Sequence, residues 1–208
     1  MTNWEKSIQN LNISGIASFD NVPKNIIDYL KKSIKRKKNL KFNKGLLGHI
    51  KEEYLYSNIP EKIKEFFIEK IFENSILKFH LDKIDILTKN APLVLDKLWC
   101  NFMKKYEFNP LHGHSGVFSF IIFLKIPYDL QKEDKVFPEV NKIHLTSRLQ
   151  FVTVSPTTGI QSIILDVDKS FENKMLIFPA NFKHEVYPFY TSDEERITVS
   201  GNIKFFNG

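Results

Sequence analysis

The sequence predicts an α+β protein, with a helical first part and a second part of antiparallel strands arranged as a sandwich or jelly roll. Two observations lead to this prediction. Residues 1–92 carry apolar residues at helical spacing, whereas residues 93–208 consist of short runs rich in β-branched and aromatic residues. No linker rich in glycine, serine or proline separates the parts, so we expect 1–92 to pack on a core formed by 93–208.

The helical part is predicted from two amphipathic segments. Apolar residues recur at helical spacing in residues 26–34, after Val22 and Pro23, and again in residues 63–72, after Pro60. A proline is favourable at the start of a helix. Residues 45–56 lie between these segments, and they predict either a short helix or an ordered loop.

The β part is predicted from seven apolar runs. These runs are 93–103, 117–126, 149–155, 160–166, 175–178, 184–187 and 196–205. The long polar segment 127–147 is expected to be either a lid over a site or a surface loop. Four phenylalanines in the strands are expected in the core rather than in a pocket. They are Phe118, Phe120, Phe123 and Phe151.

Composition limits the class of protein. The chain has 208 residues, of which 42% are apolar and 26% charged, close to globular averages. No run of eighteen uncharged apolar residues occurs, and the first residues lack a secretion signal pattern, so we expect neither a membrane protein nor a secreted one. The single cysteine, Cys100, favours an intracellular setting, and we expect a buried structural thiol.

The net charge of +6 leaves nucleic acid as a weakly supported partner. Only three of the 30 basic residues are arginine, and the densest basic run, from Lys31 to Lys38, extends an amphipathic segment. A solvated helix face explains this run better than a grip on phosphates does.

The histidines are the first sign of a metal site. His112 and His114 form an H-x-H pair in NPLHGHSG, and His184 follows far downstream in FPANFKHEV. Side chains two residues apart on an extended segment point the same way, so this pair can converge with His184 on one ion. Three protein ligands leave open positions, as a non-haem Fe(II) centre requires. The other histidines, His49, His80 and His144, show no ligand spacing.

Arg196 follows His184 by twelve residues across the polar turn YTSDEE, so we expect the two strands to form a hairpin. On the later strand Arg196, Thr198, Ser200 and Asn202 share one face. A guanidinium beside two hydroxyls suits a carboxylate, which it can bind through two parallel hydrogen bonds.

Two residues of this region also allow a purely structural role. Arg196 could form a surface ion pair with Asp193 or Glu194. Asn101 shares a strand face with Trp99 and could hydrogen-bond cosubstrate or substrate, or serve only in strand pairing.

Three ordered segments, WCNFMKKYEFNPLHGHSGVFSFIIFLKIP, MLIFPANFKHEVYPFY and EERITVSGN, resemble bacterial and phage members of the Fe(II)- and 2-oxoglutarate-dependent oxygenases, which include prolyl hydroxylases. The resemblance covers roughly residues 93–206 and implies a double-stranded β-helix. It implies that His112 and His184 are iron ligands, and that Arg196 anchors the 5-carboxylate of 2-oxoglutarate with help from Thr198 or Ser200. Because Cys100 favours an intracellular setting, we also expect a cytoplasmic enzyme, in an infected host cell if the protein is viral.

The chain departs from the wider superfamily at one ligand, because His114 stands where that pattern has a carboxylate. Three alternatives follow: His114 is a neutral third ligand, which we favour; a carboxylate comes from elsewhere; or the position stays open to an exogenous ligand. The candidate carboxylates are Glu107, Glu139 and Asp166.

If the resemblance holds, the protein hydroxylates a protein side chain, a nucleobase or a small molecule, and releases succinate and CO2. Two alternatives remain. One is a cupin-like metalloenzyme in which three histidines bind iron and the substrate without 2-oxoglutarate. The other is a non-catalytic jelly-roll protein that serves in structure or interaction.

Overall fold

The computed structural model describes residues 1–36, 38–84, 91–139, 143–155 and 159–206. Its strands are β1 (Ala17–Phe19), β2 (Glu53–Leu55), β3 (Leu93–Met103), β4 (Asn109–His112), β5 (Phe118–Lys125), β6 (Leu149–Ser155), β7 (Gly159–Leu165), β8 (Met175–Pro179), β9 (Lys183–Val186) and β10 (Arg196–Phe205). Its helices are α1 (Asn3–Ser14), α2 (Lys24–Ser33), α3 (Glu61–Glu73), α4 (Ser75–Lys83) and α5 (Leu130–Glu133), with short 3-10 turns η1 (Asn43–Gly45) and η2 (Lys169–Phe171).

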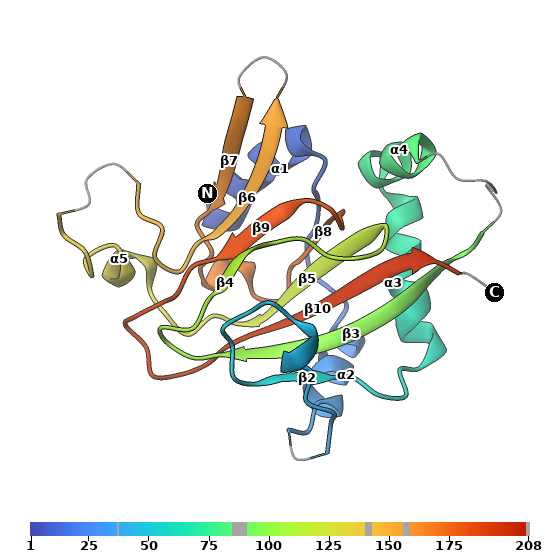
Figure 1. The fold of residues 1–208 in the computed structure, drawn as a ribbon, viewed down its shortest axis with the longest axis horizontal. Coiled ribbons are helices and arrows are strands. Elements are labelled where there is room, and N and C mark those ends of the chain that lie inside the picture. The colour runs from blue at the N-terminus through green and yellow to red at the C-terminus, as the bar shows by residue number, and fades with distance from the viewer. Residues whose placement is uncertain (37, 85–90, 140–142, 156–158, 207–208) are drawn as a thin grey trace.

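The strands form two antiparallel sheets. The six-stranded sheet has the order β1-β8-β5-β10-β3-β2, and the four-stranded sheet has the order β4-β9-β6-β7. Figure 1 shows β5, β10 and β3 running side by side through the middle of the molecule. This arrangement is a jelly roll of the double-stranded β-helix type, so the predicted fold class is confirmed.

The sequence placed most strands closely. The predicted runs 93–103, 149–155 and 196–205 have the bounds of β3, β6 and β10, and the other four runs overlap β5, β7, β8 and β9. Helices α2 and α3 begin directly after Pro23 and Pro60, as expected. Segment 45–56 is mainly loop, and it ends in β2, which the sequence did not predict.

The hydrophobic core has two layers, one on each face of the large sheet. On the outer face, side chains of α2, α3 and α4 pack against β3, β5 and β10, with Phe67 stacked on Phe120. On the inner face, residues of both sheets pack together with α1. The four strand phenylalanines are buried as expected, and none of them lines the cavity beside the histidines.

The predicted hairpin between the His184 and Arg196 strands is wrong. Strand β9 pairs with β4 and β6 in the small sheet, whereas β10 pairs with β3 and β5 in the large one. The polar segment between them crosses from one sheet to the other instead of turning back. His184 and Arg196 therefore lie on facing sheets and approach the same space from two sides. They can still belong to one site, as a hairpin would have allowed.

The structure also tests the expectations for Cys100, for the basic run and for membrane-spanning segments. Cys100 is fully buried, and burial raises the pKa of its thiol to about 12, as suits a structural thiol. The expected helix face for the basic run is wrong beyond Ser33, where α2 ends. Arg36 lies 3.9 Å over the Phe102 ring and pairs with Glu52 and Glu195, while Lys37 lies outside the described residues. None of the described helices is long and apolar enough to cross a membrane.

Candidate functional site

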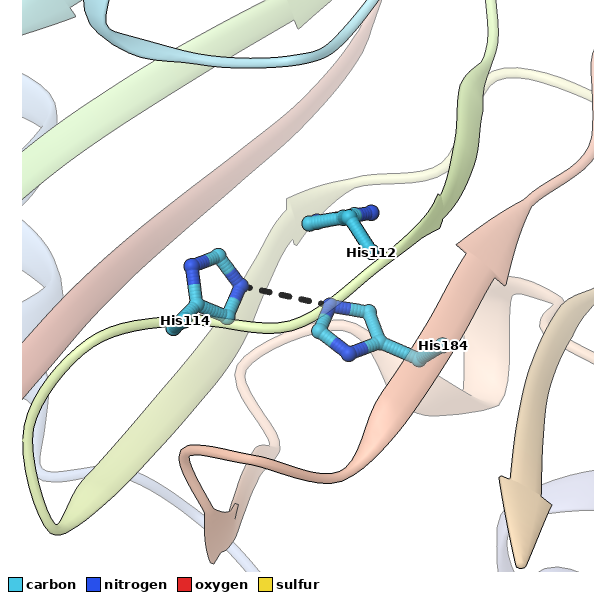
Figure 2. A group of neighbouring side chains, drawn as sticks. All are labelled: His112, His114 and His184. Atoms are coloured by element: carbon cyan, nitrogen blue, oxygen red, sulfur yellow. Dashed lines mark hydrogen bonds between the residues drawn. The ribbon is translucent and has the colours of Figure 1, made fainter.

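Three histidines meet between the two sheets (Figure 2). His112 ends β4, His114 lies in the loop that follows, and His184 lies opposite His112 in β9. One ring nitrogen from each lies within 4.8 Å of the others. Among the described residues this is the group of histidine, cysteine and acidic side chains that could hold a metal ion.

Hydrogen bonds to main-chain carbonyls orient two of the rings. The Nδ1 of His112 lies 2.7 Å from the Pro110 oxygen, and the Nδ1 of His184 lies 3.1 Å from the Phe182 oxygen. A carbonyl only accepts, so each Nδ1 carries the proton and each Nε2 presents a lone pair. The Nε2 of His184 lies in hydrogen-bond contact with His114 Nε2. Such carbonyl contacts are typical of histidines that bind metals.

The protein environment keeps all three imidazoles neutral. Burial lowers the pKa of His112, lowers that of His114 to about 4, and lowers that of His184 well below its ordinary value. Mutual repulsion between the charged forms adds to this effect at His114 and His184. A neutral imidazole is the form that binds a metal, so the cluster is prepared for one.

The spacing of the cluster fits a metal ion. The Nε2 atoms of His114 and His184 lie 3.3 Å apart. Two nitrogens bound to one ion at about 2.1 Å, in neighbouring coordination positions, lie about 3.0 to 3.4 Å apart.

The candidate carboxylates lie elsewhere. Glu107 accepts hydrogen bonds from the backbone amides of Lys51 and Lys104, and Asp166 pairs with Arg148. Neither belongs to the histidine cluster, and exposed Glu139 does not either. Among the described residues, the cluster therefore offers three neutral ligands and no carboxylate.

A cavity of about 200 Å³ opens beside the histidines. One wall consists of facing residues of β3 and β10, paired across the two strands. The pairs are Met103 with Arg196, Asn101 with Thr198, Trp99 with Ser200 and Lys97 with Asn202. The predicted shared face of the Arg196 strand thus lines the same cavity as His112, His114 and His184.

Arg196 is buried, with 3% of its surface exposed, yet its Nε and Nη1 have no hydrogen-bond partner among the described residues. The alternative of a surface ion pair is wrong, because Asp193 pairs with Lys105 and Glu194 pairs with Lys125. A buried guanidinium without an anion is costly, so this geometry points to a bound anion in the cavity.

Asn101 connects the two strands beside Arg196. Its Nδ2 lies 3.2 Å from Thr198 Oγ1 and 3.3 Å from Ser200 Oγ, and it donates to both. The hydroxyl oxygens act as acceptors there, so their own protons remain available to an anion near Arg196. Asn101 thus has a role in strand pairing that also prepares an anion site.

The sequence missed a further part of the cavity lining. Residues 45–48 and 50 line the cavity together with Phe42 and Glu53, and described parts of segment 127–147 do not. The segment packs tightly, because a Cβ on Gly48 would lie 1.9 Å from Asn109 Oδ1. Two glycines three residues apart were the available signal for such a close approach.

Comparison with known proteins agrees with this site. A family model described as "Putative 2OG-Fe(II) oxygenase" matches residues 97–202, just over half of the chain. The matched span contains the three histidines and Arg196. No curated protein matches the chain.

Solved structures are similar in fold across nearly the whole chain. A prolyl-4-hydroxylase from Pseudomonas putida aligns with TM-score 0.54 and 11% identity over 97% of this chain and 98% of its own. An oxidoreductase of the 2OG-Fe(II) oxygenase family from Burkholderia pseudomallei aligns with TM-score 0.53 and 13% identity over 100% and 92%. HygX from Streptomyces hygroscopicus, solved with nickel, 2-oxoglutarate and hygromycin B, aligns with TM-score 0.51 and 9% identity over 98% and 87%.

Proposed function

Because this chain belongs to the 2OG-Fe(II) oxygenase family, whose cofactors are Fe(II) and 2-oxoglutarate, we propose that it is a dioxygenase that hydroxylates its substrate. The observation that carries the proposal is the buried guanidinium of Arg196, whose Nε and Nη1 have no hydrogen-bond partner in the described part of the chain, in the cavity that also holds three neutral histidines. A metal site and an anion site in one small cavity are what an Fe(II) enzyme with a dicarboxylate cosubstrate needs.

His112, His114 and His184 would hold the iron, with Nε2 of His112 and His184 as ligand atoms. Iron bound there supplies the chemistry by which 2-oxoglutarate, O2 and a substrate C–H bond become succinate, CO2 and a C–OH product. Three neutral ligands leave the full charge of the ion in the cavity, which favours an anionic cosubstrate.

Arg196 would bind the 5-carboxylate of 2-oxoglutarate through two parallel hydrogen bonds. Thr198 and Ser200 would each donate a hydrogen bond from the hydroxyl group to the same carboxylate. Their oxygens already accept hydrogen bonds from Asn101, so their O–H groups remain available as donors. These contacts fix the end of the cosubstrate remote from the metal, and so orient its reactive end.

Aromatic side chains protect the metal side of the cavity from water. The rings of Phe151 and Phe178 lie 5.4 and 5.0 Å from the His184 ring, and Trp99 lies 5.7 Å from His114. All three aromatic residues are buried. A dry wall strengthens the interactions of charged groups inside the cavity and limits side reactions with water.

The substrate we propose is a protein side chain, a nucleobase or a small molecule. It would enter beside segment 45–50, where Leu47 is exposed at the cavity mouth. The short cavity leaves room for only part of a large substrate, so a macromolecule would insert a single residue or base.

The decisive experiment is an anaerobic titration of Fe(II)-loaded protein with 2-oxoglutarate, observed through the weak visible charge-transfer band of the chelate. We expect the band in the wild type and its loss in Arg196→Ala. Iron binding without the band would instead favour a three-histidine metalloenzyme that does not use 2-oxoglutarate. Failure to bind iron would favour a non-catalytic jelly-roll protein.

A further inference from the structure

We infer that the cavity contains a second polar subsite, built on Glu53, that binds a cationic group of the substrate, an ammonium or a guanidinium. The inference rests on the proposed function, because it assigns a chemical class to the substrate of that same cavity. Glu53 lies in β2, at the edge of the large sheet, and lines the cavity.

Glu53 is a buried carboxyl group without a cation. Only 1% of its surface is exposed, and its polar contact is a hydrogen bond from Asn43 Nδ2 to Oε2 at 3.2 Å. Within the described part of the chain, no lysine, arginine or histidine forms an ion pair with it. Lys97, which also lines the cavity, is exposed and places its ammonium 5.6 Å from the Phe42 ring.

Further acceptor oxygens line the same cavity as this carboxyl group. Glu53 lies directly opposite Asn101 in the pairing of β2 with β3. The Oδ1 atoms of Asn101 and Asn109 are buried and without a hydrogen-bond partner among the described residues, and both side chains line the cavity. Three side chains thus offer acceptors to one space, which suits a ligand with several N–H donors.

The local charge also favours a cation. Burial penalises the ionised form of Glu53, and repulsion from Glu107 adds to this penalty, so the pKa of Glu53 is raised to about 7. A bound ammonium or guanidinium would remove both penalties. The buried Arg148, by contrast, has Asp134 and Asp166 as partners, so this chain does pair buried charges elsewhere.

The two charged ends of the cavity are separated by one strand. Arg196 lies on β10 and Glu53 on β2, with β3 between them, which places the strands about 10 Å apart. An anionic cosubstrate at Arg196 therefore leaves Glu53 free for a second molecule. The rings of Phe42 and Trp99, 5.9 Å apart, line the same side. The Lys97 ammonium already lies over the Phe42 ring, and Trp99 can contact a further cation by its face.

The test uses full-length protein loaded with Ni(II), which replaces iron without turnover, and saturated with 2-oxoglutarate at pH 8. Two probes of similar shape, n-butylguanidinium and neutral n-butylurea, are titrated and followed by ligand-observed NMR. We expect the wild type to bind the cation at least tenfold more tightly than the urea. Glu53→Gln should lose this preference, because it keeps the shape of the side chain and removes its charge.

Glu52→Gln is the matched control, because it removes the same charge one residue earlier, where Glu52 pairs with Arg36 and Lys104 outside the cavity. It should keep the preference. The inference is overturned if the wild type shows no preference for the cation, a result that does not depend on any variant folding. It is also overturned if Glu53→Gln behaves like Glu52→Gln.

Binding of Ni(II) and 2-oxoglutarate, measured first by calorimetry, separates this inference from the proposed function. If the wild type binds neither, the proposed function fails, whatever the probes show. If both bind and the cation has no advantage, the assignment of Glu53 alone is wrong.

Discussion

Asn101 lies opposite Thr198 in the register of β3 and β10, and its Nδ2 donates a hydrogen bond to Thr198 Oγ1 over 3.2 Å. The same nitrogen reaches Ser200 Oγ at 3.3 Å. One amide therefore occupies an acceptor position on each of two hydroxyl oxygens. In the proposed anion site, Asn101 would prepare these hydroxyls without touching the anion.

We expect Asn101→Ala to weaken 2-oxoglutarate binding about three- to tenfold, the worth of one or two neutral hydrogen bonds. Metal binding should not change, because Asn101 contacts none of the histidines by a hydrogen bond. Calorimetric titration of Ni(II)-loaded protein measures both. Asn202→Ala removes an amide on the same wall and is the control. An equal loss in both variants would contradict the specific role of Asn101.

Arg196→Lys should weaken 2-oxoglutarate binding tenfold or more, although it retains the charge, because an ammonium cannot form two parallel hydrogen bonds. The same titration measures this change. Arg148→Lys is a suitable control, since Arg148 is also buried but pairs with Asp134 and Asp166. Near wild-type affinity in Arg196→Lys would argue against Arg196 as the carboxylate anchor.

His114→Ala should reduce iron occupancy as much as His112→Ala or His184→Ala, because all three rings belong to one cluster. Iron is measured by atomic emission after anaerobic loading and desalting. His49→Ala serves as control, because His49 stacks on Phe108 away from the cluster. Full iron loading of His114→Ala would show that the third ligand is another group.

Glu53 should make the metal-free protein less stable as the pH rises. Its pKa is about 7 in the fold, above the ordinary value of 4.5, so the native state holds this proton more tightly than the unfolded state does. The protonated Glu53 therefore stabilises the native state at low pH. Between about pH 4.5 and 7 this contribution to the free energy of unfolding is lost, by at most about 1.4 kcal/mol per pH unit. Urea unfolding of the wild type and Glu53→Gln from pH 5 to 8 checks this.

The difference between the two unfolding curves isolates Glu53, because the histidines have lowered pKa values and make the opposite contribution in both proteins. Glu53→Gln should gain stability relative to the wild type as the pH rises. Parallel curves would mean that the Glu53 carboxyl is solvated or already paired.

The sequence predicted the centre of the fold better than its edges. Strands β3, β6 and β10 are long and apolar, so their residues alone identify them. Strands β1 and β2 have three residues each and exist because they pair with β8 and β3. Such tertiary pairing leaves no periodic pattern to detect. Helix α1 was not predicted, although the sequence does contain a signal for it. The capping box of Thr2 and Glu5 predicts a helix start.

Residues of the candidate site likewise divide into those that the sequence alone identifies and those that only the fold brings into place. His112, His184 and Arg196 were identified from motifs, because their spacing carries a chemical meaning. Glu53 was not predicted as a site residue, because a glutamate in KEEYLY resembles a surface residue. Only the pairing of β2 with β3 places it opposite Asn101. The exchange of sheets between β9 and β10 was also beyond the sequence, because a polar turn of this length permits a hairpin or a crossing alike.

The position of β10 between β3 and β5 has a consequence for the order in which the molecule is assembled. Both neighbours are synthesised long before β10, and their facing edges stay unpaired until it arrives. All three histidines also leave the ribosome before Arg196 does. The three proposed metal ligands therefore precede the proposed cosubstrate wall, which forms in the same late event that joins the two halves of the large sheet.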